Sequence, residues 1–114
     1  PYDVVNVHEP SAAVVALGRR AAGSPLLAVT SHGVEDRGWA AAREDARAGR
    51  VRLSLKTRLA HPVTVLAPAR AGLRRADHVF CLNEDDRRFL LRTYRLAPES
   101  VTRMFPGADP AYLE

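Results

Sequence analysis

The sequence predicts an α/β domain with a parallel sheet of about four strands and helices on both faces. Two observations lead to this prediction. Short apolar runs of strand length recur along the chain and alternate with longer stretches of helical pattern. The 114 residues are enough for one domain, and a content of 46% hydrophobic and 26% charged residues is typical of a globular chain.

The first strand, helix and second strand are indicated within the first thirty residues. Residues 3–7 form a β-branched run that stops before Pro10, because proline ends strand pairing. Ser11 is placed to cap a helix over residues 12–22, which a Gly-Ser-Pro turn ends. Residues 26–30 are continuously apolar, the pattern of a strand covered on both faces.

The middle of the chain is predicted to be helical with interruptions. Residues 35–58 are charged and rich in alanine and arginine, which favours a helix with a break near Gly49. Pro62 and Pro68 each restrict the preceding residue and are expected to kink or interrupt a helix between residues 60 and 75. A helix that resumes at Pro68 would place that proline in the first turn, where it is tolerated.

The last third of the chain predicts a strand, a helix and a short strand. Residues 78–82 form an apolar strand, and Asn83 follows where a helix needs a capping side chain. Three carboxylates come next and suit the positive end of a helix that runs through Tyr94. Residues 101–105 complete a Rossmann-like order of elements.

Composition narrows the partners and the compartment. The formal net charge is +4 and the pI is about 10.0, which could steer nucleotide phosphates, an anionic membrane or nucleic acid. Nucleic acid is disfavoured because the aromatics are few and do not alternate with the arginines. No apolar run is long enough to span a membrane. A peripheral membrane contact of the arginine-rich residues 37–58 stays open, although a solvated helix face is favoured.

The single cysteine, Cys81, lies in an apolar run, so no disulfide framework can form and the thiol is expected to pack as a small hydrophobe. A reducing compartment fits this pattern, and we expect a cytoplasmic protein.

Histidines follow two successive predicted strands. In open parallel sheets ligands bind beyond the carboxyl ends of the strands. His8 and His32 occupy equivalent positions there, so we expect them side by side at one rim of the sheet. An imidazole at such a rim can bind a sugar hydroxyl or a phosphate oxygen, or accept a proton near neutral pH. The adjacent Gly33 would allow a ligand to approach the backbone closely.

Several other site classes lack support. The histidines are not spaced on one helix face and no CxxC occurs, so no metal site is expected. His61 and His78 are interpreted as structural. The chain contains neither GxGxxG, GxxxxGK[ST] nor GxSxG, which argues against a dehydrogenase, a P-loop enzyme and an α/β-hydrolase in this segment.

Four motifs follow one another along the chain: YDVVNVHEP at residues 2–10, VTSHGVE at 29–35, ADHV at 76–79 and PGAD at 106–109. Their order and spacing resemble those of family 4 retaining glycosyltransferases. The similarity to this family covers the whole chain. The His-Glu-Pro and Thr-x-His pairing is similar to the phosphatidylinositol mannosyltransferase branch.

The resemblance implies the GT-B architecture, in which two Rossmann-like domains face a cleft. Residues 1–114 would form the C-terminal portion of the N-terminal, acceptor-side domain, a single incomplete domain that is inactive alone. The donor-binding domain would be absent. A nucleotide-sugar donor, held mainly by that other domain, would pass its sugar with retention to the hydroxyl of a sugar or lipid-linked acceptor. No metal or other cofactor is implied.

The resemblance also implies roles for particular residues. His32 would be catalytic, facing the donor sugar and the acceptor. The residues expected to bind substrate are His8, Glu9, Ser31, Gly33 and Asp109. Pro106 departs from the family, which usually has asparagine at that position, whereas Gly107 and Asp109 match. Asp109 could equally form a turn or cap a helix.

Two other functions stay open. A non-catalytic Rossmann-like module could bind sugars or nucleotides with the same fold. A sugar-nucleotide epimerase on the GT-B plan would share the motifs as well. Fold alone does not separate these functions.

Overall fold

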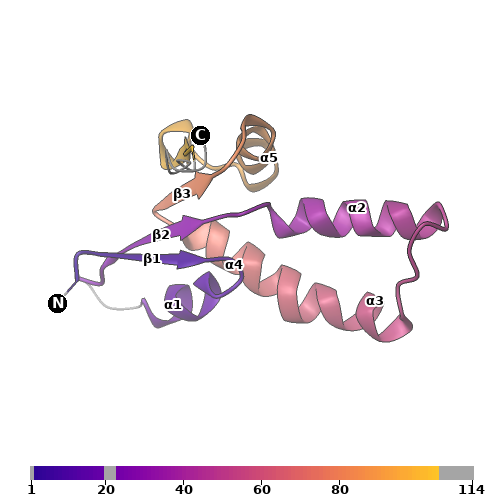
Figure 1. Ribbon diagram of the computed structural model, residues 1–114. Helices are drawn as coiled ribbons and strands as arrows, with labels where there is room; N and C mark the ends of the chain where they lie inside the picture. The colour runs from indigo at the N-terminus through magenta and orange to yellow at the C-terminus, as the bar shows by residue number, and fades with distance from the viewer. Residues whose placement is uncertain (1, 20–22, 106–114) are drawn as a thin grey trace, which may run out of the picture.

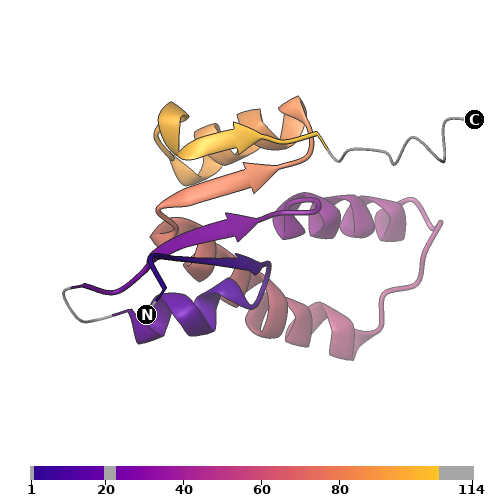
Figure 2. The same cartoon turned by 60° about the vertical axis from the view of Figure 1, so that its left-hand side comes forward.

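A computed structural model describes residues 2–19 and 23–105 and confirms an α/β fold with a four-stranded parallel sheet (Figures 1 and 2). The strands are β1 (Val4–His8), β2 (Leu26–Thr30), β3 (His78–Cys81) and β4 (Val101–Arg103). They lie in the order β1-β2-β3-β4, with each strand parallel to its neighbours. All their carboxyl ends therefore meet at one rim of the sheet.

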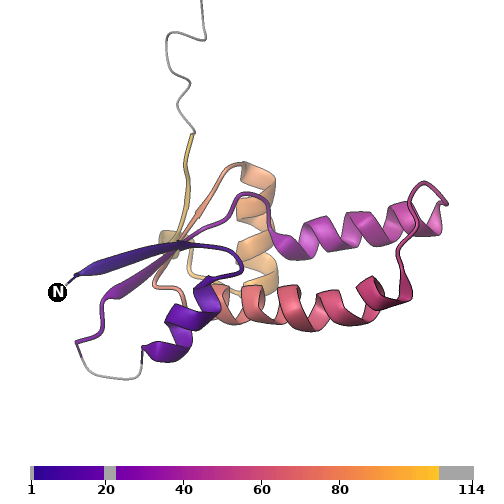
Figure 3. The same ribbon diagram turned by 60° about the horizontal axis from the view of Figure 1, so that its bottom comes forward.

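Three helices pack against the sheet. α1 (Ala12–Gly18) and α4 (Ala67–Arg75) lie against each other and contact β2, while α5 (Glu84–Tyr94) accompanies β3 and β4 (Figure 3). Buried residues of all three helices share a single core with alternate strand residues. Since alternate strand residues point to one face, these helices cover that face. The sequence predicts helices on both faces, and within the described residues the structure has them on one face.

The core is apolar and continuous. Val29 of β2 pairs with Val79 of β3, which pairs with Val101 of β4, so the three side chains form a row beneath the helices. The other buried members of this core are Ala12, Ala16, Leu27, Val34, Leu73, Cys81, Leu90 and Tyr94. Burial raises the pKa of the Cys81 thiol, which keeps it protonated, as expected for a cysteine that packs as a hydrophobe.

Two helical segments project beyond the sheet and form what we call the helical arm, residues 35–66. α2 (Glu35–Arg47) runs outward, and α3 (Leu55–His61) followed by the π-helical turn η1 (Pro62–Leu66) runs back into α4 (Figure 1). Neither α2 nor α3 has a buried residue. The predicted break occurs at Gly49, whose φ of 74° favours glycine.

The two prolines do not end the helix. Helical structure continues from residue 55 to residue 75 through both of them. Around Pro62 the chain widens into the π turn, and the N–H of Ala67 bonds to the Pro62 carbonyl five residues back. Pro68 lies in the first turn of α4, as predicted. The wider turn removes the interruption because it changes which carbonyls need an N–H donor.

The remaining element boundaries differ little from the prediction. α1 ends at Gly18, and residues 20–22 of the predicted helix lie outside the described part of the chain. Asn83 caps α5 as predicted, because its Oδ1 accepts the N–H of Asp86 at 2.7 Å. In the described residues, no helix is both long enough and apolar enough to cross a membrane.

Candidate functional site

His8 and His32 lie in contact at the carboxyl-end rim of the sheet. His8 is the last residue of β1 and pairs with Thr30, and His32 follows two residues later along the neighbouring chain segment. The Nε2 atom of His32 and the Nδ1 atom of His8 are 2.8 Å apart. Their rings stack with centroids 4.8 Å apart and an interplanar angle of 23°. The structure thus brings together the two imidazoles that the strand order places side by side.

The contact between the rings constrains their protonation. One of the two nitrogens must carry the hydrogen and the other must accept it, whichever tautomer is present. If both imidazoles were cationic, both nitrogens would carry hydrogens and the contact would be lost. Both rings are exposed, so the nitrogens outside the contact remain free to meet a ligand. The pair can donate hydrogen bonds to hydroxyls and accept one proton.

Glu9 follows His8 in the chain and contacts the beginning of α2. Its Oε2 accepts the backbone N–H of Glu35 at 3.4 Å. Its Oε1 is buried and has no hydrogen-bond partner among the described residues. Burial raises the pKa of the Glu9 carboxyl, an effect that the nearby Ser31 hydroxyl and the Glu35 N–H partly oppose. The Oε1 atom of Glu9 therefore keeps an acceptor that a ligand hydroxyl could use.

Ser31 is fully buried directly beneath the rim. Its Oγ also lacks a hydrogen-bond partner among the described residues. It lies near enough to Glu9 to influence that carboxyl, but the two groups do not reach hydrogen-bonding geometry. The N–H of Ser31 bonds to the Phe80 carbonyl of β3 at 2.8 Å, which holds the turn after β2 against the sheet.

Gly33 forms the turn between β2 and α2. Its φ is 140°, in the region that favours glycine, and nothing lies within 4 Å of the position that a side chain would occupy. An open backbone therefore adjoins His32. Asp109, the remaining predicted binding residue, lies outside the described residues, as does Gly107.

Asn6 and Thr30 share the sheet face of His8 but were not singled out from the sequence. Thr30 Oγ1 donates to Asn6 Oδ1 at 3.0 Å, and Asn6 stands two residues before His8 on β1. The two-residue period of a strand was the signal that could have identified Asn6, because it puts Asn6 and His8 on one face. These polar groups extend the rim along β1 and β2.

An ion pair connects the two helices that begin at this rim. Arg37 Nη1 of α2 donates to Oδ1 of the buried Asp86 of α5 at 2.5 Å. Asn83 Nδ2 donates to the other Asp86 oxygen at 2.8 Å. The beginnings of α2 and α5 are thereby held together beside the histidines. Within the described residues, no group of three or more His, Cys, Asp or Glu side chains could hold a metal ion.

Comparison with known proteins identifies the family. A family model described as Glycosyltransferase Family 4 matches residues 1–112. No curated protein and no solved structure matches the chain. The family match covers almost the whole sequence, and the four-stranded parallel sheet is consistent with the N-terminal domain of the GT-B architecture. The chain therefore belongs to glycosyltransferase family 4.

Proposed function

We propose that this glycosyltransferase moves a sugar with retention from a nucleotide-sugar donor to an acceptor hydroxyl, and that the rim residues line its acceptor-side pocket. The observation that carries the proposal is the exposed His8–His32 pair at the carboxyl ends of two neighbouring parallel strands. Ligands of open parallel sheets bind at that rim. The membership in glycosyltransferase family 4 supplies the reaction class.

In this proposal His32 acts on the reacting sugar, and His8 fixes the orientation of the His32 ring. The 2.8 Å contact restricts rotation of both rings. The free nitrogen of His32 would then hydrogen-bond a sugar hydroxyl as the glycosidic bond loosens in an oxocarbenium-like transition state. Glu9, Ser31 and Gly33 would bind the acceptor or donor hydroxyls beside it. The unsatisfied oxygens of Glu9 and Ser31 support this assignment.

The partners and compartment follow from the same proposal. The donor would be held mainly by a second Rossmann-like domain, with residues 1–114 forming part of the acceptor-side domain. The reaction would need no metal. The acceptor would be a sugar or a lipid-linked sugar, and the protein would work in the cytoplasm. The likeness of the His-Glu-Pro and Thr-x-His motifs to the phosphatidylinositol mannosyltransferase branch suggests a mannosyl donor as the first to test.

The test begins with finding a donor for the full-length protein. A panel of UDP- and GDP-sugars would be screened for a rise in melting temperature, since a ligand that binds only the folded state stabilises it. Transfer from the stabilising donor would then be measured, and the anomeric configuration of the product determined by NMR. Inversion at the anomeric carbon would contradict the retaining mechanism. Isomerised donor without an acceptor would indicate an epimerase, and binding without turnover a non-catalytic module.

His32→Ala should reduce kcat about 100-fold or more, because it removes a hydrogen bond made to the transition state. The melting temperature should stay near that of the wild type, since the His32 side chain is exposed. His78→Ala is the matched control: His78 begins β3, at the opposite end of the sheet, and bonds Thr102. Wild-type kcat in H32A, or an equal loss in H78A, would refute the role of His32.

A further inference from the structure

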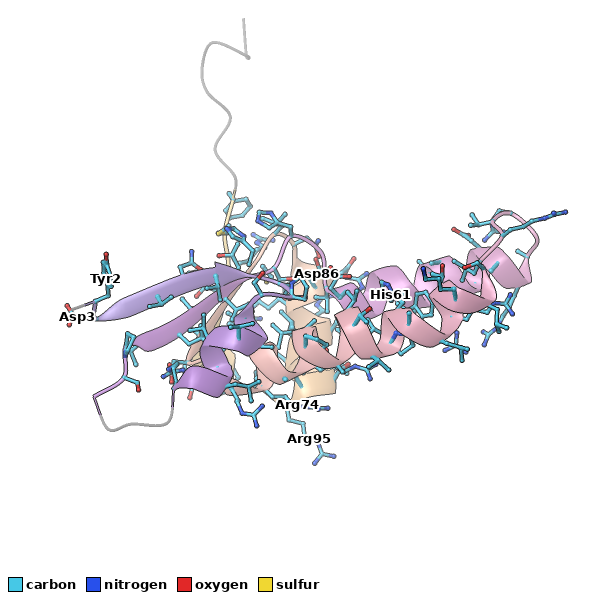
Figure 4. All side chains as sticks on the ribbon, turned by 90° about the horizontal axis from the view of Figure 1, so that it is seen from below. Tyr2, Asp3, His61, Arg74, Asp86 and Arg95 are labelled. Carbon is cyan, nitrogen blue, oxygen red and sulfur yellow. The ribbon has the colours of Figure 1, made fainter. Side chains whose placement is uncertain are left out.

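A second pocket lies on the helical arm, separate from the His8–His32 pair. Its volume is about 310 Å³, and it opens between α2 and the α3–η1 segment. The lining residues are Trp39, Arg43, Ala46, Arg47, Leu53, Arg58 and Pro62. Figure 4 shows His61 on this arm, while Asp86 marks the region where the helices meet the sheet. The pocket therefore belongs to neither the sheet rim nor the core.

Three arginines line this pocket without a partner. Arg43, Arg47 and Arg58 make no ion pair or side-chain hydrogen bond with any described residue. Other arginines of the same region are paired, as Arg50 is with Asp45 and Arg70 with Asp36. Like charges that face one cavity repel each other unless an anion lies between them.

The spacing along α2 directs these side chains to one face. Trp39, Arg43 and Arg47 stand four residues apart, so they follow one another along the helix side that faces α3. Arg58 approaches from the opposite wall. Guanidinium groups bind phosphate oxygens with two parallel hydrogen bonds, which makes a cluster of them well suited to phosphate.

The returning half of the arm is positively charged. Every charged residue between positions 46 and 76 is lysine or arginine, although the whole chain carries a formal net charge of only +4. Acidic residues lie at both ends of α2, and the pair next to the pocket is Glu44 and Asp45, of which Asp45 is paired with Arg50. The returning half of the arm thus forms a positive surface around the pocket, which concentrates anions near it.

The pocket has an apolar side that includes Trp39. The Trp39 indole stacks on the His61 ring with centroids 4.5 Å apart and an interplanar angle of 24°. Leu53 and Pro62 extend this apolar side. Next to it lie Leu55, Leu59 and Val63, which repeat every four residues along the helix and are 72%, 68% and 70% exposed. A ligand with an anionic group and an apolar part matches both walls.

From this combination we infer that the arm pocket binds the phosphate group of an organic phosphate, with Arg43, Arg47 and Arg58 as its ligands. The phosphate could belong to a soluble phosphate ester or to a phospholipid headgroup, and both present the same oxygens to the arginines. Because exposed leucines lie beside the pocket, the phospholipid source is tested in a separate experiment. This site is independent of the proposed transfer reaction.

The test compares two triple variants of the full-length protein. Arg43→Gln, Arg47→Gln and Arg58→Gln together remove the pocket charges. The control replaces Arg52, Lys56 and Arg95 by glutamine, which removes the same charge from exposed residues that do not line the pocket. Pyrophosphate would be titrated by calorimetry into the wild type and both variants, after circular dichroism shows that all three are folded. The difference between the isotherms of the wild type and the pocket variant reports binding at this site, because any other phosphate site is unchanged in both.

Pyrophosphate should bind the pocket variant about tenfold more weakly or worse, because each charge-assisted hydrogen bond is worth at least that factor. The control variant should lose far less affinity. In a second experiment, sedimentation of the protein with phosphatidylglycerol vesicles would be compared with its sedimentation with phosphatidylcholine vesicles. Binding to the anionic vesicles that the pocket variant alone loses assigns a lipid source; pyrophosphate binding without vesicle binding assigns a soluble one. Equal weakening in both triple variants, or no binding of either probe, would overturn the inference.

Discussion

The Glu9 carboxyl is buried in a way that lowers stability at neutral pH. One of its oxygens and the hydroxyl of Ser31 lack hydrogen-bond partners among the described residues. A buried polar group left without a partner costs about 1–3 kcal/mol. Burial raises the pKa of Glu9 above its ordinary value of 4.5. Perturbed pKa values cluster at functional sites, which agrees with the role proposed for Glu9 in binding.

The raised pKa of Glu9 determines how the stability of the fold changes with pH. Because the folded-state pKa of Glu9 is raised, its protonated form stabilises the fold below the unfolded pKa near 4.5, and this stability is lost as the pH rises through the folded-state value. Glu9→Gln keeps an acceptor for the Glu35 N–H but removes the buried charge. We therefore expect E9Q to melt at a higher temperature than the wild type at pH 7.

Thermal melts at pH 4 and pH 7 would check this prediction. The advantage of E9Q should shrink toward pH 4, where the wild-type carboxyl is also protonated. Glu99→Gln serves as the control because Glu99 is exposed in the turn η2 (Pro98–Ser100). A lower melting temperature for E9Q at pH 7 would mean that the Glu9 charge stabilises the rim.

At the scale of elements, the packing of α1 on α4 depends on the absence of a side chain at Gly72. A Cβ atom there would lie 2.5 Å from the Ala12 Cβ and 3.1 Å from the Ala12 and Ala13 backbone. Gly72 is buried, and Ala12 is fully buried in the core beneath β2. Small residues on both helices therefore let the backbones approach closely enough to cover the sheet.

Gly72→Ala should destabilise the fold by about 1–2 kcal/mol, since overpacking outweighs the gain in helix propensity. Gly38→Ala is the matched control within α2, where nothing lies within 4 Å of the added carbon. That change should stabilise the protein by about 0.5–1 kcal/mol. Urea unfolding of both variants would separate the two effects. Equal stabilisation would show that α1 and α4 can separate without cost.

For the whole molecule, Asp36 connects three helices that are distant in sequence. Asp36 belongs to α2, accepts hydrogen bonds from Arg70 of α4 at 3.0 and 3.1 Å, and also accepts the hydroxyl hydrogen of Tyr94 of α5. Burial alone would raise the pKa of Asp36, but the hydrogen bonds from Arg70 and Tyr94 outweigh it and lower the pKa. The helical arm is thus attached to the two helices behind the sheet.

Asp36→Asn should destabilise the protein by about 1–3 kcal/mol at pH 7, because it removes charge-assisted hydrogen bonds of a side chain that is only 13% exposed. A lowered folded-state pKa gives stability that is present above the unfolded value of 3.8 and is lost as the pH falls through the folded-state value. The difference between D36N and the wild type should therefore narrow in acid.

Urea unfolding at pH 7 and pH 3 would measure this narrowing. The control is Asp45→Asn, which breaks the exposed ion pair with Arg50 and should cost less than about 1 kcal/mol. If D36N lost the same stability at both pH values, the packing of the Asp36 side chain, rather than its charge, would attach the helical arm.

Local patterns were sufficient to predict much of the fold. Each strand lies within a short run that the sequence predicts as a strand, and Asn83 caps α5 through a bond to a residue three positions later. The break at Gly49 likewise depends on one backbone conformation. The path through Pro62 was not predictable, because the π turn changes hydrogen bonds over five residues that propensities treat one at a time.

The sequence by itself determined the succession of strands along the chain and their parallel direction, and with it the positions of His8 and His32 just beyond two successive strands, because strand periodicity and crossover handedness follow general rules. Only the tertiary structure decided that the rings touch, that Asp36 joins three helices, and that unpaired arginines line a pocket on the arm. Those features depend on side chains that meet across 24 or more residues or across two helices, and no sequence pattern specifies such distances.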